Sequence, residues 1–430
     1  MTAMEGTTKR FRIHEELREA ILQKIIERIS LDEIERTDAV TLREEIAVIA
    51  KDELSSTPLT FHERQRIVGE IINELTGFGP IEPLLKDQTI SDIIVNGPAD
   101  VFIERYGRLE RVKARFRGRE HLMHTIRKLV GAAGRRIDES APMVDAFLSD
   151  NSRVNAIIPP VAFAPSVSIR KFMRSVTGLK QMIDIGSISA EMGEFLRLCI
   201  EGKLNILVSG GTGTGKTTLL NAISKFIPQS ERIITVEDSF ELMISQPNMV
   251  RLVTRLPNVE GKGGVSQRQL VINCLRMRPD RIIVGEVRGS EVWDMLQAMN
   301  TGHAGSITTV HANSALDSLH RLETMAMLTG YEITEATLKA IISRSIDIVI
   351  HLARFVTGER KIIQITEIVG VENNRFIIDD IFRFTPGPVA EGRVTGNFHC
   401  MKDSLSNKLM DKIALSGMQT DAIKGILRKG

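Results

Sequence analysis

Apolar residues near the start of the chain recur at helical spacing. Between residues 21 and 29 they stand three or four positions apart, amid Glu, Arg and Lys. This is the pattern of an amphipathic helix with a charged, solvated face. We therefore expect residues 11–56 to be helical and to form a small solvated bundle or a docking arm.

The pattern changes between residues 61 and 172. The stretch FHERQRIVGEIINELT predicts a helix over 61–76, and REHLMHTIRKLVGAAG predicts another. Short β-like runs predict strands in SDIIVNG, VFIERYGRLERV, RVNAIIPP and SVSIRKF. Tyr106 and Gly107 suit the turn of a hairpin. This region is predicted to be a small, mixed α+β domain.

After residue 187 strands and helices alternate. LNILVSG, RIITVED, RIIVGE and GSITTVH are apolar runs rich in β-branched residues, and helical patterns separate them. Continuous apolar strands that alternate with helices are typical of a mostly parallel sheet covered on both faces. The sequence therefore predicts an α/β domain.

A chain of 430 residues is long for one hydrophobic core, so more than one domain is expected. The predicted parts are a charged helical segment, an α+β domain, a linker, an α/β domain and a C-terminal tail. Their bounds are 1–60, 61–172, 173–186, 187–385 and 386–430. The tail is rich in Gly and polar residues and ends in a helical pattern, and the sequence assigns it no function.

The amino-acid composition excludes few classes of protein. Lys and Arg number 56 against 54 Asp and Glu, a net charge of +2, so the overall charge does not indicate nucleic acid or an acidic surface as the main partner. The cysteines Cys199, Cys274 and Cys400 are too dispersed for a disulfide framework or a metal-ligand pair, and they fit a reducing compartment.

Nothing in the hydropathy pattern predicts a membrane span. No apolar run approaches the roughly 18–20 residues that a transmembrane helix requires. The first residues are polar and charged, without the apolar segment of a signal peptide. We expect a cytoplasmic protein that reaches a membrane only through partners.

The stretch GGTGTGKT fits the phosphate-loop pattern G-x-x-x-x-G-K-[ST]. Its glycines allow successive backbone N–H groups to turn inward around an anion, and the following helix directs its positive dipole end at phosphate. In such loops the lysine reaches the β- and γ-phosphate oxygens and the threonine hydroxyl binds Mg²⁺. The residues expected to bind nucleotide are Gly210, Gly211, Thr212, Gly213, Thr214, Gly215, Lys216, Thr217 and Thr218.

Two other interpretations of this loop are weaker. A glycine-rich connection without a ligand does not explain the apolar strand before it and the helix after it, which are the context of a phosphate loop. A dinucleotide site needs G-x-G-x-x-G, and here the third glycine comes one residue early. Nucleoside triphosphate binding is the prediction.

Polar residues follow three further predicted strands. Glu237 and Asp238 end RIITVED, Glu286 follows RIIV, and His303 and His311 stand on either side of GSITTV. Since the carboxyl ends of parallel strands meet at one edge, the two glutamates should converge on the phosphates. There a carboxylate can deprotonate the attacking water or hold Mg²⁺ through water. Alone, each glutamate could be a cap or surface charge, and each histidine a satisfied polar residue. Zinc is not expected, because no Cys or carboxylate joins the histidines at ligand spacing.

Four stretches in this order resemble the Walker A, Asp, Walker B and His boxes of the secretion ATPase superfamily: GGTGTGKTTLL, TVEDSFEL, NCLRMRPDRIIVGEVRGSE and TGHAGSITTVHANS. That superfamily drives type II and type IV secretion, type IV pili and archaeal flagella. GRRIDESAPMVDAFLSDNSRVNAIIPP, SIRKF and RLETMAML resemble its CpaF-like branch, which serves Tad/Flp pili. The resemblance covers residues 65–385.

Two small departures from that branch stand out. Asn151 occupies a turn in which relatives have glycine, and Ser239 follows the Asp box where many have proline. The dispersed cysteines cannot form the four-cysteine zinc module that some relatives carry.

The resemblance implies a RecA-like ATPase domain preceded by a smaller PAS-like α+β domain. Lys216 and Thr217 would bind the phosphates and Mg²⁺ of ATP. Glu286 would be the general base, and Glu237 would help to order the water and the metal. His303 and His311 would sense the γ-phosphate.

Arginines are also implied. Arg153 and Arg170 match positions of the N-terminal domain that close over the nucleotide in relatives, where an added cation speeds hydrolysis. Arg251 and Arg255 are weaker candidates for the same task, from a neighbouring subunit. The alternatives are surface charge for the first pair and interdomain salt bridges for the second.

The resemblance further implies a hexameric ring in which nucleotide opens and closes the two domains about a hinge at 173–186. The prediction is a cytoplasmic, Mg²⁺-dependent ATPase motor for Tad/Flp pili, partnered by polytopic inner-membrane platform proteins. Pilus extension and retraction both stay open.

Three alternatives remain for the function. One is a motor for type II or type IV secretion or for conjugation. Another is a nucleic-acid translocase, against which the single Trp293, two tyrosines and near-neutral charge argue. The last is a scaffold that binds ATP without cycling.

Overall fold

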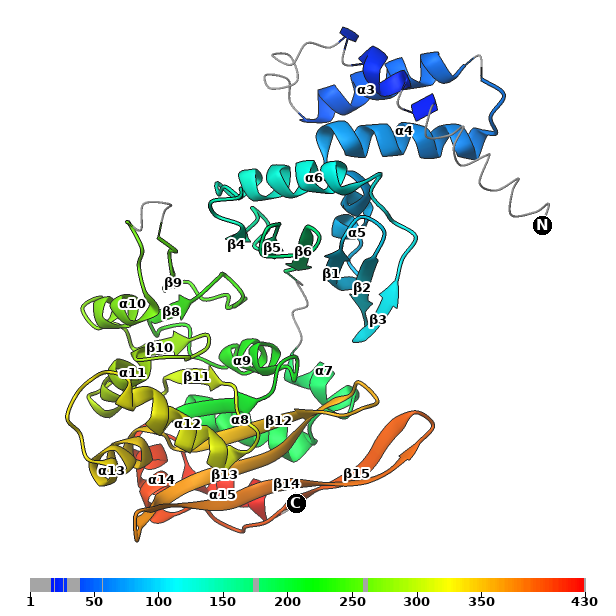
Figure 1. The fold of residues 1–430 in the computed structure, drawn as a ribbon. Helices are drawn as coiled ribbons and strands as arrows, with labels where there is room; N and C mark the ends of the chain where they lie inside the picture. Colours follow the sequence, from blue (N-terminus) through cyan, green and yellow to red (C-terminus); the bar gives the residue numbers. More distant parts are fainter. Residues whose placement is uncertain are drawn as a thin grey trace. The chain divides into compact units, whose positions relative to one another are not determined.

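The computed structural model describes residues 17–18, 20–25, 27–28, 39–55, 57–172, 178–257 and 262–428. It divides the chain into two compact units, Met1–Met173 and Arg174–Gly430. Figure 1 shows their elements, and the two units are treated separately below. Among the described helices, none combines the length and the apolar character needed to cross a bilayer.

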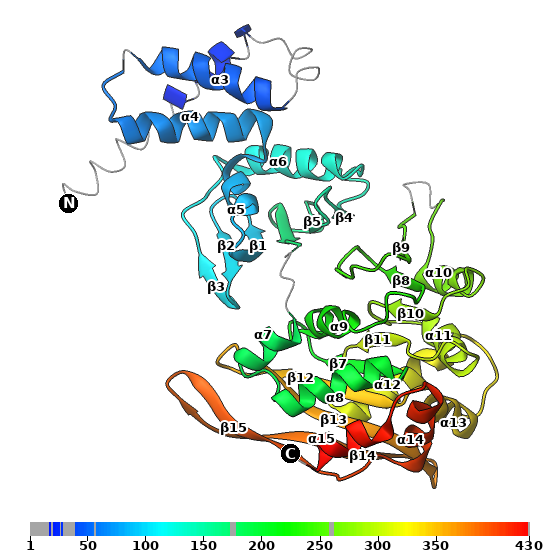
Figure 2. The same ribbon diagram turned by 180° about the vertical axis from the view of Figure 1, so that it is seen from behind.

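The first unit begins with helices. α3 (Ala39–Leu54) lies along α4 (Phe61–Thr76), as Figures 1 and 2 both show. Ile46 of α3 and Ile71 of α4 are buried in one hydrophobic cluster, which Ile25 from the preceding helical residues joins. The helix predicted over 61–76 is confirmed. Of the predicted 11–56 segment, the described residues of 17–28 are helical, and residues 11–16, 19, 26, 29–38 and 56 lie outside the described residues.

A six-stranded antiparallel sheet forms the rest of this unit, in the order β3-β2-β1-β6-β5-β4. Tyr106 and Gly107 have positive φ angles of 51° and 78° and make the predicted hairpin turn between β2 and β3. The elements are η1 (Gly79–Ile81), α5 (Glu82–Lys86), β1 (Ile90–Asn96), β2 (Val101–Arg105), β3 (Arg108–Arg111), α6 (Arg119–Ala132), β4 (Met143–Phe147), β5 (Arg153–Ile157) and β6 (Ser166–Arg170).

Only one face of this sheet belongs to the hydrophobic core. Leu122 and Ile126 of α6 pack with alternate residues of the strands, such as Ile93 and Val154. The intervening residues of β5 and β6, including Arg153 and Arg170, are exposed on the other face. This alternation is what a half-buried antiparallel sheet requires.

The second unit is built on a nine-stranded sheet in the order β15-β14-β13-β12-β7-β11-β10-β8-β9. The run from β12 to β9 is parallel, and β13, β14 and β15 are antiparallel additions. Its elements are α7 (Leu179–Asp184), α8 (Ala190–Glu201), β7 (Ile206–Gly210), α9 (Lys216–Ser224), β8 (Ile233–Glu237), β9 (Met249–Val253), α10 (Gln267–Cys274), β10 (Arg281–Val284), α11 (Glu291–Asn300), β11 (Ile307–Val310), α12 (Ala315–Met327), α13 (Glu335–Ser345), β12 (Ile348–Arg354), β13 (Arg360–Glu372), β14 (Arg375–Ala390), β15 (Arg393–Cys400), α14 (Asn407–Leu415) and α15 (Thr420–Leu427).

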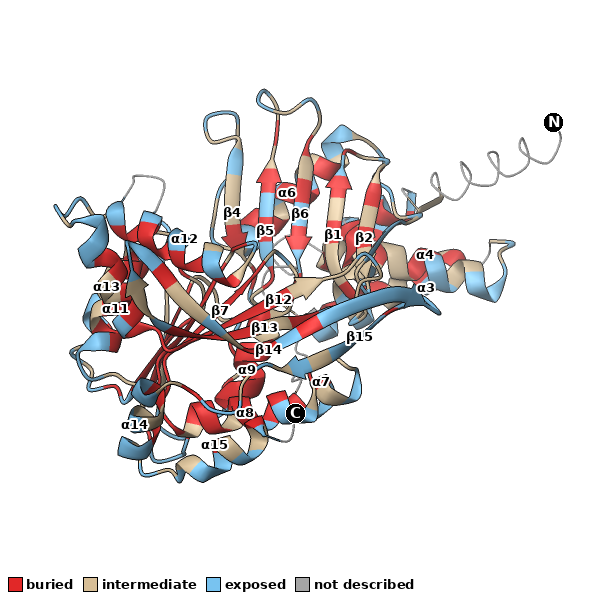
Figure 3. Cartoon of the chain, turned by 90° about the horizontal axis from the view of Figure 1, so that it is seen from below, coloured by how far each residue is buried: buried red, intermediate tan, exposed pale blue. Residues whose placement is uncertain are grey.

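Helices cover both faces of the parallel part. One core lies under α7, α8, α9, α14 and α15, and the other lies under α10 to α13. Ile206 and Leu207, adjacent on β7, face opposite cores. Figure 3 shows these central strands as continuously buried. The predicted mostly parallel α/β architecture is confirmed.

The predicted tail and linker need correction. β14 runs through the expected boundary at residue 385, and Leu409 and Ile423 of the C-terminal helices are fully buried in a core of the second unit. Part of the expected linker forms α7, whose Leu179 and Met182 join the same core. Both segments therefore belong to the second unit; residues 173–177 lie outside the described residues.

Candidate active site

The glycine loop joins the buried strand β7 to α9, and its backbone requires glycine. Gly213 and Gly215 have φ angles of 70° and 98°, in the left-handed region that favours glycine. Gly210 has φ 154°, and a Cβ there would lie 2.6 Å from the carbonyl oxygen of Leu352 and 2.7 Å from Oγ1 of Thr214. The backbone of the loop therefore encloses a space, the cradle, which side chains at the glycine positions would fill.

Lys216 is the first residue of α9, and its ammonium group lies inside this cradle. Nζ donates to the carbonyl oxygens of Gly210 and Gly211 at 2.9 Å each, and it lies 3.4 Å from Nδ1 of His311. The amino end of α9 adds backbone N–H groups and a positive dipole end at the same place. The loop and lysine together fit a polyphosphate.

A pocket beside the loop collects the ends of two further strands. Glu237 ends β8, and Glu286 follows β10 by two residues. The structure therefore brings together Thr217 and the two glutamates that the sequence predicted would converge. The pocket is lined by Thr217, Glu237, Asp238, Ser239, Glu241, Leu242, Gly285, Glu286 and Arg288.

Glu286 is held by two basic side chains. Arg288 donates from Nε and Nη2 to its two carboxylate oxygens at 3.1 Å each, and Nε2 of His311 lies 2.9 Å from Oε1. Burial raises the pKa of Glu286, but the hydrogen bonds and charge of Arg288, with His311 and Lys216, outweigh this and hold it below its ordinary value. The carboxylate is ionised at neutral pH and able to accept a proton.

Glu237 is more deeply buried, with 2% of its surface exposed. Its Oε2 accepts from the backbone N–H groups of Glu241 and Leu242 at 2.8 and 2.7 Å, and its Oε1 accepts from Oγ1 of Thr235 at 3.1 Å. Nη2 of Arg251 lies 3.5 Å from Oε1. Burial raises the pKa of Glu237 above its ordinary value. These contacts shape the pocket wall at residues 238–242.

The two histidines lie at opposite ends of β11. His311 bridges Lys216 and Glu286, and burial together with the nearby cations lowers its pKa, against the raising effect of Glu286. A neutral ring satisfies both contacts when Nε2–H donates to Glu286 and Nδ1 accepts from Lys216. His303 instead precedes the strand, and its Nδ1 lies 3.3 Å from the carbonyl oxygen of Ala298.

Parallel pairing of β11 with β7 places His303 at the edge of the sheet opposite the phosphate loop. The γ-phosphate contact that the resemblance implied for His303 is therefore not supported, and a backbone carbonyl accounts for its polar ring. Arg255 is not among the residues that line the pocket, and its backbone pairs with Val265. Since His303 and His311 stand on either side of one strand, only one of them can lie at the edge that carries the phosphate loop.

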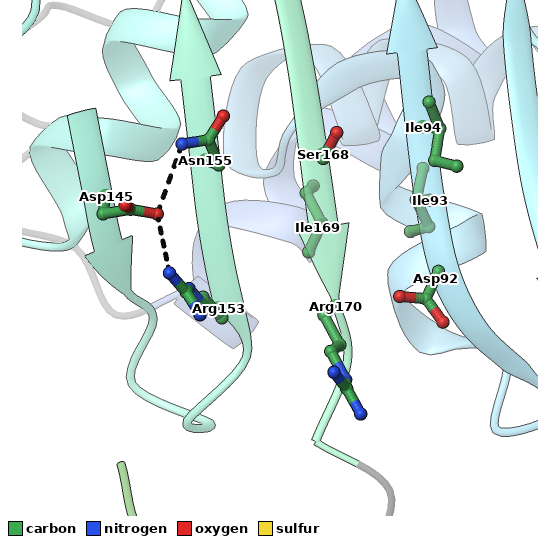
Figure 4. A pocket seen from close by; sticks show the side chains of 9 residues that line it. All are labelled: Asp92, Ile93, Ile94, Asp145, Arg153, Asn155, Ser168, Ile169 and Arg170. Atoms are coloured by element: carbon green, nitrogen blue, oxygen red, sulfur yellow. Dashed lines mark hydrogen bonds and ion pairs between the residues drawn. The ribbon is translucent and has the colours of Figure 1, made fainter. Parts of the chain in front are cut away.

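Arg153 and Arg170 belong to the first unit. They are direct cross-strand partners on β5 and β6, on the open face of the six-stranded sheet. Figure 4 shows them in a pocket with Asp92 and Asp145; Nη2 of Arg153 lies 3.4 Å from Oδ1 of Asp145. The two guanidinium groups share this pocket with the carboxylates of Asp92 and Asp145, and Asp92 is the cross-strand partner of Arg170 on β1.

Sequence reasoning missed several residues around the loop. Arg288 stands within the Walker B stretch and could have been noticed there. His351 and Arg360 are far from the loop in sequence. β12, which carries His351, pairs with β7, and β13, which begins at Arg360, pairs with β12. Nε of Arg360 donates to the carbonyl oxygen of Gly213 at 2.7 Å, and His351 is hydrogen-bonded to Ser209.

A glycine cradle between a buried parallel strand and a helix, with carboxylates at neighbouring strand ends, defines the class of P-loop nucleotide-binding proteins. Residues 74–376 match the family described as Type II/IV secretion system protein, and the chain belongs to that family. This confirms the resemblance at the level of the family.

Relatives include a putative conjugal transfer protein of Mycobacterium tuberculosis, 39% identical over 299 residues that make up 68% of this chain and 84% of the relative. The type IV secretion system protein VirB11 of Bartonella quintana is 29% identical over 328 residues, which cover 68% of this chain and 92% of that protein. A crystal structure of the VirB11 ATPase from Brucella suis has 29% identity and a TM-score of 0.37, and covers 69% of this chain and 96% of that one.

Proposed function

We propose that this protein is a Mg²⁺-dependent ATP hydrolase that serves as the motor of a bacterial envelope machine. The observation that carries the proposal is the convergence of Lys216, Thr217, Glu286 and His311 at one edge of the sheet. A site for binding alone needs the loop and lysine. A half-buried, ionised carboxylate beyond the end of a strand of the same sheet is what hydrolysis additionally requires.

Each residue then has a defined task. The loop amides and Lys216 bind the β- and γ-phosphates, and the Thr217 hydroxyl holds Mg²⁺, which neutralises phosphate charge when bound. Glu286 accepts a proton from the water whose oxygen attacks the γ-phosphorus, while the bond from that phosphorus to the bridging oxygen breaks and ADP leaves. His311 orients the carboxylate relative to Lys216.

Glu237 has a supporting task in this proposal. Its carboxylate orders residues 238–242 beside the reacting water and holds Arg251 against the pocket. Through its position next to Thr217 in the pocket wall it also influences the metal.

Arg153 and Arg170 would add positive charge at the γ-phosphate. As direct cross-strand neighbours both arginines can contact one anion, in exchange for the carboxylates of Asp92 and Asp145 that share their pocket. Closure of the first unit over bound ATP, and its release after hydrolysis, would convert chemistry into movement. Arg251 is committed to Glu237 and Phe240, over whose ring its guanidinium lies at 4.6 Å, so it is a weaker candidate.

We further propose that the motor works as a homo-hexamer in the cytoplasm, bound to polytopic inner-membrane platform proteins, and that it assembles Tad/Flp pili. The stretches from GRRIDES to SIRKF in the first unit and RLETMAML in the second support this branch. A second candidate is a conjugation or type IV secretion motor, which the names of the M. tuberculosis and Bartonella relatives favour. Loss of pili rather than of DNA or protein transfer on gene deletion would decide between them.

The test is phosphate release by the purified full-length chain with Mg²⁺ and saturating ATP, with its membrane platform present. Lys216→Ala should abolish release and weaken ATP binding in calorimetry. Lys225→Ala is the matched control, since Lys225 is exposed at the end of the same helix. Absence of phosphate release from the unaltered chain under these conditions would contradict the proposed function.

A further inference from the structure

A buried polar pair lies directly behind the phosphate loop. Ser209 and His351 are register partners on β7 and β12, 0% and 4% exposed, and Oγ lies 3.0 Å from Nδ1. Two residues earlier on the same strands, Leu207 and Val349 belong to the apolar core under α10 to α13. A polar pair in such surroundings costs stability unless its hydrogen bonds are made.

The pair also contacts the segment that follows β11. The Ser209 hydroxyl donates to the carbonyl oxygen of Ser314 at 3.4 Å. The bond between His351 and Ser209 forms in either tautomer of the ring. When Nδ1 carries the ring proton, the Ser209 hydroxyl donates onward to Ser314; in the other tautomer the hydroxyl donates to Nδ1. Ser314 is itself fixed, because its side chain accepts from the backbone N–H of Asp317 and caps α12.

Ser314 stands three residues after His311, which touches both Lys216 and Glu286. The segment between them is short, so the position of Ser314 limits where the His311 ring can lie. Ser209 stands immediately before Gly210, the first residue of the cradle. The same two side chains therefore adjoin both the phosphate loop and the strand end that carries His311.

The His351 ring is suited to a fixed structural bond. Burial lowers its pKa below the ordinary value, and the charge of Lys216 acts in the same direction. A hydrogen bond to the backbone of Asn313 and the charge of Asp317 oppose this only in part. The ring is neutral at cytoplasmic pH and does not compete with Lys216 for phosphate.

We propose that His351 is a positioning residue for ATP hydrolysis, which through Ser209 and Ser314 fixes His311 between Lys216 and Glu286. The proposal rests on the proposed hydrolase function and adds to it a residue of β12 that never touches the nucleotide. Binding of ATP needs the cradle and lysine, whereas turnover also needs His311 in place. Loss of His351 should therefore lower kcat more than it weakens binding.

The first experiment measures kcat and ATP affinity in the full chain. His351→Phe keeps the ring volume and removes the nitrogens, and we expect kcat to fall about 10- to 100-fold, the range expected when a catalytic group is misplaced by about 1 Å. ATP affinity should change little. His351→Asn restores a nitrogen near the position of Nδ1 and should recover part of the rate. Ile350→Val is the matched control, since Ile350 is the preceding buried residue of β12 and faces the other core.

The second experiment asks whether His351 acts through His311. In a His311→Ala background, His351→Phe should cause no further loss of kcat. An equal loss in both backgrounds would show a general structural effect and overturn the proposal, as would an unchanged kcat in the single variant. If His351→Phe does not fold, Ser209→Ala removes the same link and is held to the same outcomes.

A third measurement does not depend on hydrolysis. Nitrogen chemical shifts report the tautomer of the His311 ring, and they should change on His351→Phe and stay constant on Ile350→Val. Unchanged His311 shifts would overturn the proposal. A shift change in a chain that releases no phosphate would contradict the hydrolase function and leave the His351 link standing.

Discussion

The two sheets of this protein handle charge in opposite ways. In the second unit the parallel part of the sheet is covered on both faces, and Glu286 sits at its edge with 19% of its side chain exposed and Arg288 and His311 as partners. In the first unit one face is open, and Arg153 is 49% exposed with a single 3.4 Å contact to Asp145.

Under the proposed function this difference follows from what each group would do. A catalytic base is best held in place before substrate arrives, because reorganisation during the reaction adds to the barrier. An arginine proposed to meet the phosphate only on closure would have to move, and a loosely paired, exposed side chain is released at little cost. The edge of the nine-stranded sheet therefore suits a group that is fixed before substrate binds, and the exposed face of the six-stranded sheet suits a group that moves.

The largest effect on hydrolysis is expected at Glu286, at the edge of the nine-stranded sheet. Glu286→Gln keeps the shape of the side chain and removes the proton acceptor, so phosphate release should fall about 10²- to 10⁴-fold. ATP affinity measured by calorimetry should persist, because the loop and Lys216 are unchanged. Glu332→Gln, at an exposed position, is the control. A variant that turns over normally would remove Glu286 from the role of base.

The same contrast between buried and exposed charge should appear in stability. Lys412 on α14 pairs with Asp347, which is fully buried and also accepts from the backbone N–H of Asn205 at 2.7 Å. Lys412→Met leaves that carboxylate without its cation, and the second unit should lose about 3 kcal/mol of unfolding free energy.

Urea titration followed by the fluorescence of Trp293 measures this loss, because the only tryptophan of the chain lies in the second unit. Lys424→Met is the control: its pair with Asp421 on α15 is exposed, at 3.9 Å, and should contribute less than about 1 kcal/mol. Equal shifts in the two variants would argue against an integral C-terminal segment.

These contacts also show which features the sequence could predict. The phosphate loop was predictable because strand, glycines, lysine and helix are contiguous, and Glu237 and Glu286 because each stands at or just beyond the carboxyl end of a strand. The packing of the C-terminal segment could not be predicted, because the contacts of Leu409, Lys412 and Ile423 are with residues distant in sequence. Lys412, for example, pairs with Asp347, 65 residues earlier. His351 was missed for the same reason.

A smaller effect on turnover is expected from Arg153, on the exposed face of the six-stranded sheet. Arg153→Ala should lower turnover about 10- to 100-fold, less than the ~10³-fold of a lone arginine finger, because Arg170 stays on the neighbouring strand. The double variant should lose more than either single one. Single-turnover phosphate release with ATP affinity measured in parallel provides the test, and Arg108→Ala, on the exposed strand β3, provides the control. An unaltered kcat in Arg153→Ala would return Arg153 to the role of surface charge.

The smallest expected effect is on the pH dependence of hydrolysis, and it again concerns Glu286. The pKa of Glu286 lies below its ordinary value, with burial opposing the hydrogen bonds and charge of Arg288, so the base is ionised above that pKa and hydrolysis falls only as pH drops through it. Arg288→Gln removes the main lowering influence, and burial then dominates. The acid limb of kcat should move to higher pH, whereas the half-exposed Arg153 should leave it in place when replaced by Ala. An acid limb that does not move in Arg288→Gln would mean that another group titrates there.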